Sequence, residues 1–222
     1  MSKLIAFYGN SLLEKENSYS SFLAAANRNF YGILASVRFT KDHIPITSKK
    51  AHLVINGKRY YINQYTFEEL KELGVFNFPH DVSTIFEVYL SICKKYQKWA
   101  FIEINNTTKE DDLEILYNML EENEMLDQCK IVSRYFDKLI FFRKKSLKIG
   151  LQLIISNYAD SYFFDACKYH LDLMLPFTKV SNDIVFFFHD NRINCGAYTI
   201  SNPIIISLYE DTRVDYIYIT NL

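Results

Sequence analysis

The sequence predicts an α/β fold in which eight strand–helix units close into a (β/α)8 TIM barrel. Short apolar runs alternate with charged amphipathic segments along all 222 residues. This alternation is typical of a parallel sheet built by right-handed crossovers. About eight units in this length favour a closed barrel over an open sheet. No G-x-G-x-x-G or P-loop motif follows a predicted strand, which argues against a nucleotide-binding open sheet.

Composition predicts one domain over residues 1–222 in a cytoplasmic protein. There are only 6 glycines and 4 prolines, and no linker interrupts the pattern. The 25 Lys and Arg residues balance 26 Asp and Glu residues, so the broad basic surface of a nucleic-acid-binding protein is absent. No apolar run reaches the roughly 18 residues of a membrane span, and the N-terminus is too poor in apolar residues for a signal peptide.

The four cysteines carry no metal-binding or redox motif. Cys93, Cys129, Cys167 and Cys195 lie far apart in the sequence, with no C-x-x-C pair. We expect reduced thiols in the core of a cytoplasmic protein. Two disulfides in an exported protein remain the alternative.

The first half of the chain is predicted to contain three strands, two of which pair in a hairpin, and three helices. Residues 4–7 and 31–39 form strands, and residues 44–48 pair with the second of these, because only the four residues from Thr40 to His43 separate them. Thr66 and Glu69 form a capping-box pattern. The predicted helices of this half are 16–28, 66–73 and 83–96.

The second half alternates more regularly. Its amphipathic segments predict helices because their apolar residues recur at helical spacing. The predicted strands are 99–104, 130–132, 147–155, 171–175, 193–199 and 214–219. The predicted helices are 109–122, 136–144, 161–169, 181–189 and 203–209.

Several short motifs follow one another in the order found in one family of barrel enzymes. The chain has I-A-F-Y-G-N-S at 5–11, G-I-L-A-S-V-R-F-T-K-D-H-I-P-I-T at 32–47 and F-I-E-I-N at 101–105. Further motifs are N-G-K at 56–58, Y-T-F-E-E-L at 65–70, A-Y-T-I-S at 197–201 and V-D-Y-I at 214–217. Over essentially the whole chain these motifs resemble the glycerophosphodiester phosphodiesterases, phospholipase-C-like TIM barrels. Their matching stretches include I-A-H-R-G-A-S, G-I-E-L-D-V-R-L-T-K-D-G-V-P-V-V and I-E-I-K. The resemblance implies that type of barrel with an early β-hairpin.

The chain departs from this family at most of the positions that carry its chemistry. By the resemblance, the two catalytic histidines fall on Phe7 and Lys49, and the phosphate-binding arginine falls on Tyr8. Two metal-binding carboxylates fall on Leu34 and Ser36, and the lysine of I-E-I-K falls on Asn105. Only Glu103, the third metal ligand, remains.

These replacements remove what phosphodiester hydrolysis needs. A base, an acid and positive charge on the phosphate are required. Phe7 cannot transfer a proton, and a divalent cation needs several oxygen ligands. We therefore expect no cofactor, where the family would use Ca²⁺ or Mg²⁺, and a pseudoenzyme that binds a small molecule or a protein. The alternatives are an active phosphoric diester hydrolase of lipid metabolism with an altered site, using His52 or Lys49, and a barrel with another activity or a structural role.

The hairpin predicts where the altered positions meet. With the turn at residues 40–43, the residue numbers of cross-strand partners add up to about 83. This places Leu34 opposite Lys49 and Ser36 near Thr47, with residues 34 and 36 on one face. An inward carboxylate needs a partner, so a direct or water-bridged contact between Lys49 and Glu103 is expected. The full set predicted to line this pocket is Phe7, Tyr8, Leu34, Ser36, Lys49, Glu103, Asn105 and Tyr198.

Overall fold

Eight parallel strands form a closed barrel. The computed structural model describes residues 2–10, 14–77, 81, 83–158, 160–200 and 212–220. Strand β1 pairs with β2 on one side and with β11 on the other, which closes the ring and confirms the predicted (β/α)8 fold. The barrel strands are β1 (Lys3–Phe7), β2 (Gly32–Phe39), β6 (Trp99–Ile104), β7 (Cys129–Ser133), β8 (Gly150–Ile154), β9 (Asp172–Pro176), β10 (Cys195–Ile200) and β11 (Tyr216–Ile219).

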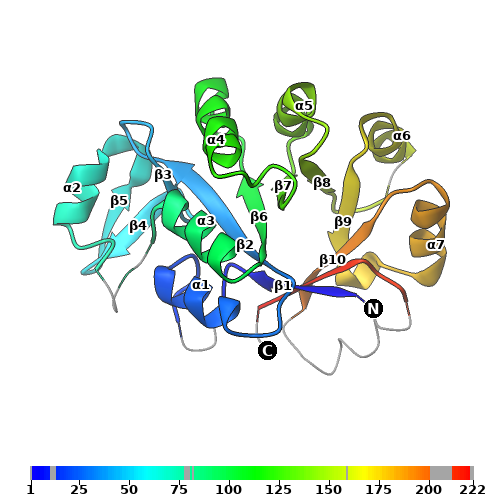
Figure 1. The fold of residues 1–222 in the computed structure, drawn as a ribbon, viewed down its shortest axis with the longest axis horizontal. Coiled ribbons are helices and arrows are strands. Elements are labelled where there is room, and N and C mark those ends of the chain that lie inside the picture. The colour runs from blue at the N-terminus through cyan, green and yellow to red at the C-terminus, as the bar shows by residue number, and fades with distance from the viewer. Residues whose placement is uncertain are drawn as a thin grey trace.

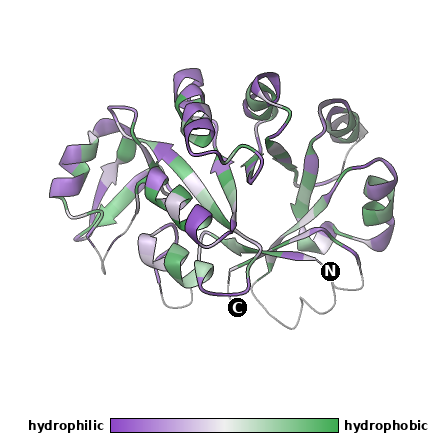
Figure 2. Ribbon diagram, viewed as in Figure 1, coloured by the Kyte–Doolittle hydropathy of each residue, from purple (hydrophilic) through white to green (hydrophobic). Residues whose placement is uncertain are grey.

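Helices surround the strands and bury their outer faces. Figure 1 shows α4 to α7 in an arc outside the ring, and Figure 2 shows that the strands inside this arc are predominantly hydrophobic. The surrounding helices are α1 (Tyr19–Ala26), α3 (Phe86–Lys95), α4 (Glu110–Glu122), α5 (Phe136–Lys145), α6 (Asp160–Tyr169) and α7 (Asn182–Asp190), with a short 3-10 turn η2 (Phe177–Lys179) before α7. The predicted helix at 203–209 lies outside the described residues.

The described part of the chain contains no helix long and apolar enough to cross a membrane. Its four cysteines are free thiols, and three of them, Cys93, Cys129 and Cys195, are fully buried. Burial raises the pKa of each of these three thiols to about 12. Thiols held in the neutral form in this way are poor nucleophiles, so they serve as packing groups.

The predicted hairpin forms, but its register differs by one residue from the prediction. Strand β3 (Pro45–Thr47) pairs with β2 so that Val37 lies opposite Thr47, and the Ser48 N–H donates to the Ser36 carbonyl at 2.7 Å. The difference arises because Ile44 belongs to the turn: its carbonyl accepts from the Thr40 N–H at 3.0 Å. The turn is therefore one residue longer than expected.

A second hairpin follows, which the analysis of the sequence missed. Strands β4 (His52–Ile55) and β5 (Lys58–Tyr61) are joined by Asn56 and Gly57, whose φ angles are 50° and 77°. Two positive φ angles define the turn that best fits a two-residue hairpin. Figure 1 shows this hairpin and α2 at one side of the barrel.

The second hairpin is fixed by a small core of its own and by the capped helix after it. A 3-10 turn η1 (Ile62–Gln64) leads into α2 (Phe67–Glu72), where Thr66 and Glu69 form the predicted capping box at 3.3 and 2.7 Å. The small core consists of Ile46, Leu53, Ile62, Leu70 and Val75.

The barrel interior is mostly apolar, with one buried ion pair near the amino ends of the strands. Lys130 on β7 reaches past β8 to Asp172 on β9. This path exists because Gly150 lies between them: a Cβ at Gly150 would stand 3.1 Å from Lys130 Cε. Burial lowers the pKa of Lys130, and the Asp172 carboxylate more than reverses this, so that its pKa is raised overall. The apolar interior consists of Ile5, Leu34, Phe101, Val132, Ile154, Met174 and Tyr218.

We predict that Asp172→Asn lowers the free energy of unfolding by about 3 kcal/mol, because it leaves the buried Lys130 ammonium without its counter-charge. The amide retains an oxygen for the Asn194 contacts that Asp172 makes. Urea denaturation measures the loss. The double variant Lys130→Met with Asp172→Asn should regain at least half of it, and a double variant less stable than Asp172→Asn would contradict this interpretation.

Candidate functional site at the barrel mouth

The carboxyl ends of the barrel strands surround a cavity of about 330 Å³, which we call the mouth. Active sites of (β/α)8 barrels lie at this end. All eight residues predicted to line one pocket lie around it, together with Arg38, Arg134, Ile154, Met174 and Thr199. The structure thus gathers these residues in one place, and a functional role for them remains a prediction.

The mouth has an apolar floor where the resemblance places proton-transfer and metal groups. Leu34 is 1% exposed and packs in the interior cluster with Ile154 and Met174. Phe7 at the end of β1 packs against this cluster and contacts the ring of Tyr8 at a centroid distance of 4.2 Å. Neither Phe7 nor Leu34 offers a group that moves a proton or binds a cation.

The Glu103 carboxylate is held by the phenol of Tyr8. Tyr8 Oη donates to Glu103 Oε2 at 2.6 Å, and Tyr8 is only 3% exposed. Burial and the neighbouring Glu103 charge raise the pKa of Tyr8 well above its usual value. The phenol therefore stays protonated and acts as a donor, so the two groups form a stable charge-assisted hydrogen bond.

The backbone at Tyr8 is shaped to make this contact possible. Tyr8 has a φ of 62° directly after β1, a conformation that non-glycine residues seldom adopt. Its carbonyl accepts from the Asn17 N–H at 2.9 Å and from Ser21 Oγ at 3.3 Å, which holds the turn in place. The side chain is thereby aimed across the mouth at β6.

Lys49 does not pair directly with Glu103, so that part of the prediction is wrong. Its ammonium lies 3.7 Å from Glu16 Oε2 and 4.8 Å from the centroid of the Tyr8 ring. The reason is that β3 ends at Thr47, which leaves Lys49 in the loop rather than opposite Leu34. Lys49 nevertheless lines the mouth.

The donors at the three metal positions do not fit a divalent cation. Leu34 has no donor, Ser36 offers a neutral hydroxyl, and Glu103 is engaged by Tyr8. Within the described ranges no three His, Cys, Asp or Glu side chains come together as a metal cluster. Hard cations such as Ca²⁺ and Mg²⁺ need several oxygen ligands, and this set supplies too few.

Two arginines that the sequence analysis did not single out bring positive charge to the mouth. Arg38 near the end of β2 donates to the Lys49 carbonyl at 2.9 Å and to Thr107 Oγ1 at 3.2 Å. Arg134, directly after β7, donates to Tyr198 Oη at 3.3 Å. Burial lowers the pKa of Arg38, and the Glu103 charge opposes this, so the guanidinium remains charged. Arg38 and Arg134 could have been predicted as site residues, because both lie at the carboxyl ends of barrel strands.

Asn105 and His52 have structural contacts rather than proton-transfer geometry. Asn105 Nδ2 donates to the Val37 carbonyl at 3.2 Å, and its Oδ1 accepts from the Thr107 N–H at 3.0 Å. His52 lies on β4, against the ring of Tyr61 at 5.7 Å, and lines a neighbouring hollow rather than the mouth.

Comparison with solved structures shows that the chain has the fold of the glycerophosphodiester phosphodiesterases. An Oleispira antarctica phosphodiesterase, solved in complex with the product sn-glycerol-3-phosphate, is 15% identical with a TM-score of 0.87, over 99% of this chain and 93% of that one. A glycerophosphodiester phosphodiesterase from Thermotoga maritima is 17% identical with a TM-score of 0.83, over 99% of this chain and 95% of that one. These identities establish the shared fold.

Comparison of the sequence with known proteins finds fewer similarities than comparison of the structure. No family model matches the chain. The uncharacterized protein MG385 of Mycoplasma genitalium is 27% identical over 133 residues, 57% of this chain. The matched region spans about half the length of that relative, 53%.

We predict that Tyr8→Phe lowers the free energy of unfolding by about 1.5 kcal/mol, because the Glu103 carboxylate loses a donor in a partly buried place. A double-mutant cycle with Glu103→Gln, read by urea denaturation, should give a coupling of about 1 kcal/mol between the two side chains. Additive effects of the two substitutions would show that the hydrogen bond is not formed in solution.

Proposed function

We propose that this chain is a glycerophosphodiester phosphodiesterase-like barrel that binds a small phosphate-bearing molecule at its mouth without hydrolysing it. The observation that carries the proposal is the charge of the mouth. Arg38, Lys49 and Arg134 line it together with one carboxylate, Glu103. Even when Glu16, the partner of Lys49, is counted, cations outnumber carboxylates three to two.

The chemistry of the cations suits an oxyanion. Guanidinium groups offer several donors in one plane and match phosphate oxygens well. Positive charge from side chains takes the place of the charge that a metal ion would supply. The cavity of about 330 Å³ fits a small molecule, and a protein of the same fold was solved with sn-glycerol-3-phosphate. We use that compound as the probe.

The described residues that line the mouth do not include the pair of proton-transfer groups that hydrolysis needs. Phe7 stands at one expected histidine position, and Lys49 at the other carries an ammonium paired with Glu16. The Tyr8 phenol, whose pKa is raised by burial and by Glu103, is a poor base. Loss of a general acid or base costs roughly 10²- to 10⁴-fold in rate, and the donors at the mouth do not suit a divalent cation that could compensate.

We predict that sn-glycerol-3-phosphate binds in calorimetric titration, and that Arg134→Gln or Lys49→Gln weakens it about tenfold, as the loss of one charge-assisted hydrogen bond would. The matched control is Arg59→Gln, an exposed arginine on β5 that does not line the mouth. Absence of binding, or equal weakening by the control, would contradict the proposal.

Hydrolysis is tested separately with glycerophosphocholine in the presence of Mg²⁺ or Ca²⁺. We predict no release of choline above the buffer rate, because the mouth holds neither the acid–base pair nor a metal-binding set. Metal-dependent turnover that Glu103→Ala abolishes would favour the alternative, an active hydrolase with an altered site.

A further inference from the structure

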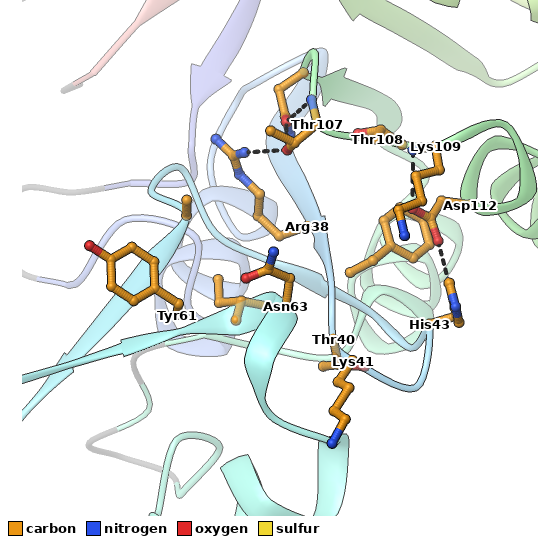
Figure 3. Close-up of a pocket in the computed structure, with 14 residues that line it drawn as sticks. Arg38, Thr40, Lys41, His43, Tyr61, Asn63, Thr107, Thr108, Lys109 and Asp112 are labelled. Carbon is orange, nitrogen blue, oxygen red and sulfur yellow. Dashed lines mark hydrogen bonds and ion pairs between the residues drawn. The ribbon is translucent and has the colours of Figure 1, made fainter.

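Beside the mouth lies a second cavity, of about 250 Å³, which we call the lateral pocket. Its walls come from three parts of the chain: the end of β2 with the turn after it, the segment that follows β5, and the loop from β6 into α4. Figure 3 shows Asn63 on one side of this space and Thr107, Thr108 and Lys109 on the other, with Arg38 hydrogen-bonded to Thr107. The lateral pocket thus lies between the barrel and the segment that contains the β4–β5 hairpin.

Hydrogen-bond donors converge on the lateral pocket, and some of them have no partner in the described part of the chain. In Figure 3 the Lys109 side chain points inward from the start of α4, and no carboxylate of the described residues lies within ion-pair distance of its ammonium. Arg38 contributes a second cation, with its Nε buried and unpartnered. The Asn63 side chain makes no hydrogen bond to the described residues and adds an amide.

Among the described residues that line the lateral pocket, the carboxylate is Asp112, and both of its oxygens accept hydrogen bonds. Asp112 is 4% exposed, and its Oδ1 lies 2.7 Å from His43 Nδ1. Its Oδ2 accepts from the Lys109 N–H at 3.1 Å. Asp112 forms no ion pair with Lys109 or Arg38, and its negative charge stays in the pocket beside them. The Lys109 ammonium, the Arg38 Nε–H and the Asn63 amide remain as donors for a ligand.

We propose that the lateral pocket binds a small oxyanion, a phosphate or a carboxylate, independently of the mouth. Arg38 is half-buried and Lys109 is exposed, and hydrogen bonds from such cations to an oxyanion are roughly twice as strong as those between neutral groups. Lys109 and Asn63 line the lateral pocket but not the mouth, whereas Lys49 and Arg134 line the mouth but not the lateral pocket. Arg38 and Asn105 form the wall between the two cavities.

The test is an amide-resolved NMR titration of the full chain with inorganic phosphate and, separately, with citrate. We expect saturable chemical-shift changes at the amides of Thr107, Thr108 and Lys109. The anion with the lower dissociation constant shows whether the pocket prefers a phosphate or a carboxylate. In Lys109→Gln the dissociation constant should rise about tenfold. In Lys49→Gln the chemical-shift changes at the lateral pocket should persist. Binding at the lateral pocket can therefore be tested even if the mouth binds no phosphate.

Lys41→Gln is the matched control. Lys41 lies at the edge of the lateral pocket, but its side chain points away from the other labelled residues in Figure 3. This control removes the same charge from the same region and should leave the dissociation constant unchanged. The proposal is overturned if neither anion gives saturable shifts there, if shifts occur only at the mouth, or if Lys41→Gln weakens binding as much as Lys109→Gln.

Discussion

The hydrogen bond from the Tyr8 phenol to the Glu103 carboxylate is the interaction on which the account of the mouth depends. A carboxylate that faces the inside of a barrel loses hydration and needs a partner. Here the partner is the phenol of Tyr8, which donates to Glu103 Oε2 at 2.6 Å. Arg38, Lys49 and Arg134 line the same cavity, and none of the three forms a direct ion pair with Glu103.

The barrel itself follows from features that a sequence carries locally. Alternating apolar runs and amphipathic segments specify the strands and helices, and parallel crossovers allow few other arrangements. The capping box at Thr66 and Glu69 is likewise a local signal, and it forms as predicted. Co-location of Phe7, Leu34 and Glu103 could be predicted because the carboxyl ends of parallel strands meet at one end of a barrel.

Other features depend on details that pattern alone does not fix. One hydrogen bond, from Thr40 to the Ile44 carbonyl, decides the register of the β2–β3 hairpin, and that register decides where Lys49 lies. The β4–β5 hairpin had a signal, since Asn-Gly between two short runs typically marks a two-residue turn. The partners of Glu103 and Lys49 are set by long-range packing of loops, which no spacing in the sequence encodes.

The most direct test of the account asks whether Glu103 belongs to a metal site at all. Paramagnetic Mn²⁺ broadens NMR signals close to where it binds, so a titration followed at the amides of Leu34, Ser36 and Glu103 reports on the mouth. We predict no saturable, local broadening in the wild-type chain. Broadening should appear in the variant with Tyr8→Phe, Leu34→Glu and Ser36→Asp, which removes the donor that holds Glu103 and adds two carboxylates. Saturable broadening at the mouth of the wild-type chain would contradict the account.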